Sequence, residues 1–203
     1  SFNFPASEDQ LTANNFSKFS EIILNKKLNK EEKILIKNLD ISNPRETISK
    51  IREKVRNLVF LSSIVVPNMS RLEISHHYGL EKFYKFGLCM ITIINQSYCK
   101  KYLFIFKNQE HPAQYHKIKQ ETFMILYGKI SLKLEYKGKT STRIMQPGEI
   151  FTIVSGMVHQ FKALSKDGAV IEEISSKHIK TDSYYIDKKI SKNKDRKSII
   201  SFY

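Results

Sequence analysis

The sequence predicts a mainly β protein in which a helical region precedes an all-β sandwich or barrel. Of the 203 residues, 41% are hydrophobic, which is enough for one domain with a full core. Apolar residues recur at helical spacing as far as residue 61. After residue 67 the pattern changes to eight or nine short β-type runs separated by turn residues. We expect a helical region over 1–67, a β-barrel over 68–190 and a basic tail over 191–203.

Three amphipathic helices are expected before the barrel, within residues 14–28, 29–39 and 43–62. In the third, Asn43 is placed to cap the helix and Pro44 fits the first helical position, where no N–H is needed. Its apolar face consists of Ile48, Ile51, Val55, Leu58 and Val59. We expect these helices to be scaffold that covers one face or end of the barrel.

The expected strands are short and follow one another closely. In chain order they are RLEISHH (71–77), LCMITIINQ (88–96), KKYLFIF (100–106), ETFMILYG (121–128), KISLKLEY (129–136), STRIMQ (141–146), EIFTIV (149–154), HQFKAL (159–164) and AVIEEIS (169–175). The stretch after residue 190 is poorly patterned and receives no element, although Ile199, Ile200 and Phe202 are candidates for packing.

The net charge of +14 invites a nucleic-acid interpretation, because basic patches bind phosphate backbones. The lysines are scattered through every segment, so we expect no nucleic-acid partner; a basic surface also suits small anionic ligands such as sugar acids. Cys89 and Cys99 are too few for a disulfide framework. No apolar run reaches the roughly 18 residues that span a bilayer, and SFNFPASEDQ does not read as a signal peptide. These features predict a cytoplasmic protein without a membrane partner.

Residues 111–128, HPAQYHKIKQETFMILYG, concentrate side chains that can bind metals. If a strand ends near His116, the period of two places Gln114 and His116 on one face, and the turn KIKQ leads directly to Glu121. His111 lies three residues before Gln114 and is expected to face the other way on a regular strand.

A second cluster follows in QPGEIFTIVSGMVHQF, residues 146–161, where Gly156 marks a bend that returns His159 to the barrel. Together, His116, Glu121 and His159 form a ligand set of two histidines and one carboxylate, which suits iron, manganese, nickel or zinc. The amide of Gln114 is a weaker donor than imidazole, so the metal is either loosely held, differently selected or absent.

These two stretches resemble the signature motifs of the cupin superfamily. The first motif reads His-x-His, four residues, Glu, six residues, Gly, and is matched by Gln114, His116, Glu121 and Gly128, with the first histidine replaced. The second reads Gly, five residues, Pro-x-Gly, two residues, His, and is matched by Gly148, Val154 in place of proline, Gly156 and His159.

Within cupins, the chain resembles the lyxose-isomerase-like group and the cupin modules attached to or encoded beside sialic-acid-type synthases. The matching residues are Tyr98, Cys99, Lys100, Lys101, His111, Pro112, Tyr115, His116, Lys117, Lys119, Glu121, Thr122, Phe123, Glu172, Glu173, Ile174 and Ser175. The resemblance implies a jelly-roll barrel and, by analogy, a homodimer.

The resemblance also implies a divalent metal, either manganese, iron, nickel or zinc, inside the barrel. Its ligands would be Gln114, His116, Glu121 and His159. The implied reaction is aldose–ketose isomerisation of a sugar, with catalytic roles for Glu173, Glu172, Lys119 and Tyr127. Glu172 and Glu173 alternate faces, so only one of them should point inward as the base, while Lys119 or Tyr127 would steady substrate oxygens.

Other interpretations stay open at this point. A histidine in a strand is more often a core or surface group than a ligand, which is the default for His76, His77, His111 and His178. Solvated charge is the default for Lys117 and Lys119. The competing function is a non-catalytic cupin that binds a sugar or sugar acid in the biosynthesis of sialic-acid-type (nonulosonic) sugars, which the loss of the first histidine favours. An iron oxygenase would use the same ligands, but nothing indicates a 2-oxoglutarate site.

Overall fold

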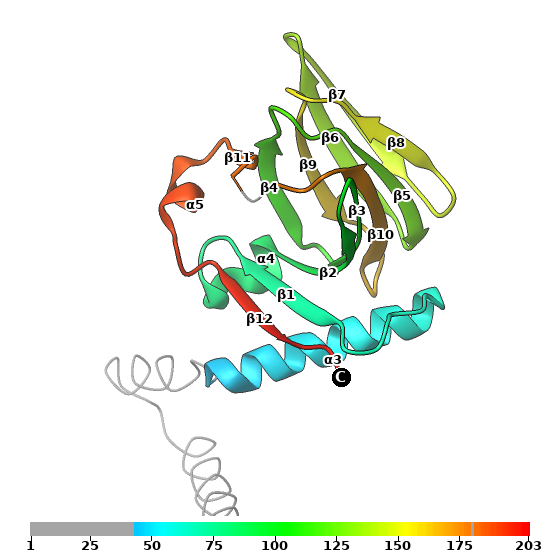
Figure 1. The fold of residues 1–203 in the computed structure, drawn as a ribbon, viewed down its shortest axis with the longest axis vertical. Coiled ribbons are helices and arrows are strands. Elements are labelled where there is room, and N and C mark those ends of the chain that lie inside the picture. Colours follow the sequence, from blue (N-terminus) through cyan, green and yellow to red (C-terminus); the bar gives the residue numbers. More distant parts are fainter. Residues whose placement is uncertain (1–42, 180) are drawn as a thin grey trace, which may run out of the picture. The chain divides into compact units, whose positions relative to one another are not determined.

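The computed structural model describes residues 43–179 and 181–203, which form two antiparallel β-sheets with a helix against the larger one (Figure 1). The larger sheet has the order β12 (Lys197–Ser201), β1 (Arg71–His76), β2 (Gly87–Asn95), β3 (Tyr98–Ile105), β10 (Ala169–Ser176), β5 (Glu121–Tyr127) and β8 (Ile150–Ile153). The smaller sheet has the order β11 (Tyr184–Tyr185), β4 (Glu110–Tyr115), β9 (Val158–Ala163), β6 (Ile130–Tyr136) and β7 (Lys139–Met145). The mainly β fold class is confirmed.

The barrel core lies between the two sheets. It is built from inward-facing apolar side chains of both sheets, among them Leu103, Ile105, Phe123, Ile125 and Ile171 from the larger sheet and Ile130, Leu132, Leu134, Phe161 and Ala163 from the smaller one. Since alternate residues of a strand point to opposite faces, each of these strands leaves its other residues outside this core. All nine strands listed from the sequence are present, with boundaries that differ by at most two residues.

Helix α3 (Pro44–Ser62) begins and packs as its sequence predicts. The Asn43 side chain accepts a hydrogen bond from the backbone N–H of Arg45 at 3.1 Å, and Pro44 opens the helix. Its buried residues include Ile51, Val55 and Leu58, which join a second apolar cluster with Leu72, Ile74, Ile91, Phe104 and Val170 on the outer face of the larger sheet. The two helices expected within 14–28 and 29–39 lie outside the described residues.

The C-terminal segment differs from the unpatterned tail expected from the sequence. Residues of β12 pair with β1, from Arg71 opposite Ser201 to Ser75 opposite Lys197, and Phe202 is buried. Only every second residue of this edge strand is partly covered, so its sequence has a weak hydrophobic pattern. Short helices η1 (Leu80–Lys82), α4 (Phe83–Phe86) and α5 (Lys188–Lys192) complete the elements. Within the described ranges, no helix has both the length and the apolar character needed to cross a membrane.

Candidate functional site

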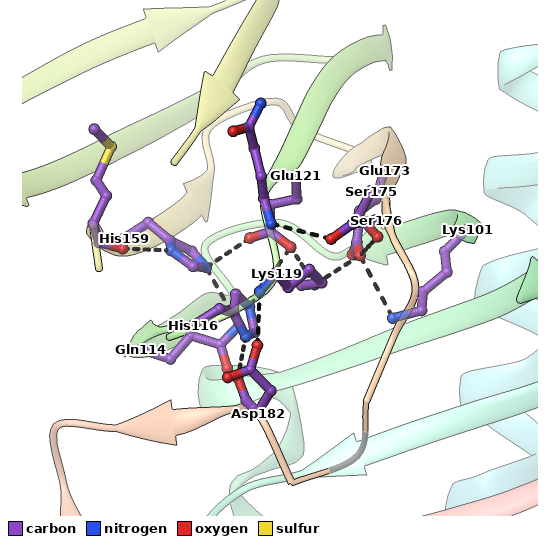
Figure 2. A network of polar contacts seen from close by, with 12 residues as sticks. Lys101, Gln114, His116, Lys119, Glu121, His159, Glu173, Ser175, Ser176 and Asp182 are labelled. Atoms are coloured by element: carbon purple, nitrogen blue, oxygen red, sulfur yellow. Dashed lines mark hydrogen bonds and ion pairs between the residues drawn. The ribbon is translucent and has the colours of Figure 1, made fainter. Parts of the chain in front are cut away.

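Three of the predicted metal ligands meet inside the barrel (Figure 2). His116 follows β4, Glu121 opens β5 and His159 lies on β9. Their exposed fractions are 3%, 2% and 0%, and their potential ligand atoms all lie within 4.8 Å of one another. The two sequence motifs therefore supply one buried cluster, His116, Glu121 and His159, which we call the ligand cluster.

Local backbone geometry explains why segments 40 residues apart meet. Gly156 has a φ of +79°, and its N–H donates to the carbonyl oxygen of His116 at 2.7 Å, which fastens the second motif to the first. Gln114 lies directly opposite His159 in the β4–β9 pairing. Its Nε2 is 3.4 Å from Nε2 of His159, so the amide lies beside the three clustered side chains.

The protons on the two imidazoles can be placed from their partners. Nδ1 of His159 faces the carbonyl oxygen of Met157 at 3.2 Å, and Nδ1 of His116 faces the carbonyl oxygen of Asp182. A carbonyl oxygen only accepts, so both Nδ1 atoms carry a proton, and Nε2 is the atom that each neutral imidazole would offer to a metal. Burial lowers the pKa of His116, although the nearby Glu121 carboxylate acts to raise it. The His116 imidazole is therefore neutral.

Both Nε2 atoms face the carboxylate of Glu121. Nε2 of His159 is 3.0 Å from Oε1 of Glu121, and Nε2 of His116 is 3.6 Å from Oε2. Among the described residues, Oε1 of Gln114, Nε2 of His116 and Oε1 of Glu121 are buried polar atoms without a hydrogen-bond partner. Converging nitrogen and oxygen lone pairs of this kind fit a divalent cation such as manganese, iron, nickel or zinc.

Asp182 lies beside the ligand cluster, and the sequence did not reveal it. Its carboxylate accepts hydrogen bonds from the backbone N–H groups of Lys117, Ile118 and Lys119, the shortest at 2.8 Å, and its own carbonyl oxygen orients His116. Burial alone would raise the pKa of Asp182, but these N–H donors outweigh it and lower the pKa. Asp182 is 66 residues from His116 and belongs to neither motif, so no local signal marks it.

We expect Asp182→Ala to weaken metal binding about 10–100-fold, as for other residues that hold a ligand in place. Three backbone N–H groups, of which that of Lys119 is buried, would lose their acceptor, which should also lower the free energy of unfolding by about 1–3 kcal/mol. Metal titration and chemical denaturation measure the two effects. Asp187→Ala is the matched control, because Asp187 caps α5 through the N–H of Lys189 and should affect stability alone. Equal metal affinity in both variants would exclude a positioning role for Asp182.

A buried chain of charges adjoins the ligand cluster (Figure 2). The ammonium of Lys119 contacts Oε2 of Glu121 and lies 2.9 Å from Oε1 of Glu173, which is 3.5 Å from the ammonium of Lys101. Burial would raise the pKa of Glu173, but Lys101 and Lys119 outweigh it and hold the pKa below its ordinary value. Burial would lower the pKa of Lys119, and the two carboxylates raise it instead. Solvated charge, the default expectation for Lys119, is therefore wrong.

The structure also separates the other predicted catalytic residues. Glu173 lines the interior, whereas Glu172 is on the opposite face and pairs with Lys100 at 2.7 Å. Tyr127 packs against the outer cluster that includes α3, next to a register shift between Val170 and Ile171. It is not among the residues that line the interior cavity. Glu173 and Lys119 thus lie beside the metal-ligand cluster, and Glu172 and Tyr127 do not.

His111 lies in the interior, contrary to the expectation that it faces away. A β-bulge between His111 and Gln114 makes three residues of β4 oppose two of β9, so both side chains point inward. Both line a cavity of about 50 Å³ together with Lys119, Glu121, Glu173 and Tyr185. A bulge cannot be read from residue spacing, which is why simple alternation failed here.

Comparisons with known proteins show which proteins the chain resembles. No protein-family model matches the chain. The chain is 26% identical over 173 residues to the D-lyxose ketol-isomerase of Thermofilum sp., a match that covers 73% of this chain and 96% of that protein. It is 25% identical over 174 residues to the D-lyxose/D-mannose isomerase of Thermosediminibacter oceani, covering 73% and 95%.

A solved structure shares the fold. The L-ribose isomerase of Cellulomonas parahominis superposes with a TM-score of 0.62 and 12% identity, covering 73% of this chain and 94% of that chain. The chain has the cupin fold, and its sequence resembles the lyxose-isomerase-like group, as its motifs predicted.

Proposed function

We propose that this protein is a metal-dependent isomerase that interconverts an aldose and a ketose, with D-lyxose as the first substrate to test. The observation that carries the proposal is the convergence of two imidazole Nε2 atoms and a carboxylate in a buried site. The similarity to two isomerases of D-lyxose supports the choice of sugar. The expected homodimer and the expected link to sialic-acid synthases stay predictions.

In this proposal the ligand cluster binds the metal, and the metal activates the sugar. His116, Glu121 and His159, with Gln114 beside them, would hold the metal. A divalent metal there would polarise adjacent carbonyl and hydroxyl oxygens of the sugar and make the intervening carbon more acidic. The hydrogen bond from His116 to the carbonyl oxygen of Asp182 keeps the metal-binding nitrogen free of its proton.

Glu173 and Lys119 would carry the proton transfers. The Glu173 carboxylate is ionised and would take the proton from the carbon that bears the hydroxyl group, then return it to the former carbonyl carbon. The Lys119 ammonium would donate a hydrogen bond to the sugar oxygen on which negative charge develops. The hydroxyl proton passes to the former carbonyl oxygen, so aldose and ketose have the same composition.

The cavity must enlarge for this reaction. Its volume of about 50 Å³ holds a few water molecules. A five-carbon sugar is larger, so its binding requires lining side chains to move apart. The contact between Lys119 and Glu121 is the one we expect to open, because a metal would take over the charge of that carboxylate.

The second candidate function is a cupin that binds a sugar without catalysis. It would be favoured if a site with Gln114 in place of histidine did not bind a metal. We expect instead that the amide oxygen changes the preference of the site. Gln114→His should increase the affinity for zinc or nickel at least about tenfold more than that for manganese, because imidazole is the softer ligand. Competition against a chelating dye measures this ratio. Gln160→His, on the same strand pair but bonded to Glu110, is the control; a shift equal for all metals would refute the expectation.

The experiment that tests the function uses the full chain incubated with manganese and D-lyxose in D₂O. Formation of the ketose, with deuterium at the carbon next to its carbonyl, would support proton transfer through a protein base. Manganese binding without any ketose would favour the binding-only cupin. If the protein neither binds manganese nor forms the ketose, the isomerase proposal is refuted.

A further inference from the structure

A second polar group lines the same cavity next to the ligand cluster. Tyr185 lies directly opposite Gln114 in the β11–β4 pairing, and Gln114 lies opposite His159 in the β4–β9 pairing. Residues directly opposite each other project to the same face of a sheet, so these three side chains form a row. His111, three residues before Gln114 on β4 and opposite Phe161, lines the same cavity.

The hydrogen-bonding state of Tyr185 follows from its partner. Nδ1 of His77 is 2.6 Å from the carbonyl oxygen of Phe86 and must be the donor. Burial lowers the pKa of His77 to about 4, so its Nε2 is unprotonated and accepts the hydroxyl proton of Tyr185 at 3.1 Å. The Tyr185 oxygen is left with lone pairs only, and it can accept a hydrogen bond from a hydroxyl group.

The ring of His111 packs against two other rings, and one of its nitrogens has no hydrogen-bond partner in the described part of the chain. Its ring stacks on Phe161, with centroids 4.8 Å apart and an interplanar angle of 6°, and meets the edge of His77 at 5.0 Å. It is 3% exposed, and its Nδ1 has no partner among the described residues. Burial, and to a lesser extent His77, lowers its pKa, so the ring is neutral with one donor and one acceptor.

We propose that His111 and Tyr185 bind hydroxyl groups of the sugar at the end away from the reacting carbons. This inference rests on the proposed isomerase function and adds the residues that recognise the rest of the substrate. A neutral donor–acceptor pair matches an uncharged polyhydroxylated chain, because hydroxyl groups both donate and accept. The lysines that line the cavity, Lys101, Lys119 and Lys197, are all engaged with carboxylates.

Kinetics with manganese-loaded full chain and D-lyxose test this inference. Tyr185→Phe and His111→Phe should each raise KM about tenfold and change kcat by less than about threefold, because they remove binding that is uniform along the reaction. Manganese content should stay at the wild-type level. His111→Asn, which keeps a donor and an acceptor, should recover part of the loss and guards against a folding defect of the Phe variant.

Tyr184→Phe is the matched control, because the Tyr184 ring stacks on Tyr115, with centroids 5.2 Å apart, and is not among the cavity-lining residues. If the wild type is active and both Phe variants have an unchanged KM, this inference is overturned and the isomerase proposal is not. Loss of manganese in the His111 variants would overturn it too, since His111 would then be a ligand. A manganese-loaded wild type that neither converts nor, by calorimetry, binds D-lyxose would overturn the isomerase proposal together with it.

Discussion

His159→Ala is expected to abolish stable metal binding and, with it, sugar isomerisation. His159 is fully buried, its Nδ1 proton is committed to Met157, and its Nε2 lies 3.0 Å from Glu121, so its loss removes one of the three converging ligand atoms. Removing a ligand should weaken binding by more than the roughly 10–100-fold that loss of a supporting residue costs. Elemental analysis of the purified protein should find near-stoichiometric metal in the wild type and none in the variant.

The control for this experiment is His76→Ala. His76 is also a buried histidine, but its Nε2 contacts Ser198 at 3.1 Å at the β1–β12 edge, so its loss should leave the metal content unchanged. Metal retained in His159→Ala would exclude the proposed ligand set. A wild type that holds no metal even after incubation with manganese, iron or nickel would leave only a binding role for the barrel.

Much of the fold and the ligand cluster could be predicted because the information is local. Strand alternation, the Asn43 cap and the Pro44 start act within a few residues of each other. The ligands His116 and Glu121 lie five residues apart, and a turn at Gly156 precedes His159, so short motifs describe the cluster.

The rest of the site depends on features that residue spacing does not encode. One bulge in β4 turns His111 inward, and a register shift beside Tyr127 accompanies its packing on the outer face. Asp182 and Tyr185 reach the site because the chain passes β4 again after β10. This path depends on how the sheets assemble and cannot be read from residue spacing. Lys119 lies in a turn by sequence, yet two carboxylates from different strands keep it buried.

The choice between Glu172 and Glu173 shows what strand parity decides. Neighbouring residues of β10 point to opposite faces, and the register with β3 and β5 places Glu173 in the cavity and Glu172 against Lys100. The two carboxylates are adjacent in sequence and differ mainly in what they face. They therefore provide a comparison in which the same substitution is made inside and outside the cavity.

Glu173→Gln is expected to lower kcat about 10²–10⁴-fold, the range typical of a lost general base, while the metal content stays unchanged. The amide keeps the shape of the side chain but cannot take a proton from the sugar carbon, so deuterium exchange into the sugar from D₂O should fall in parallel. Glu172→Gln should leave both rates within about twofold of the wild type, because it removes only the partly exposed pair with Lys100. Unchanged isomerisation in Glu173→Gln would remove Glu173 from the chemistry.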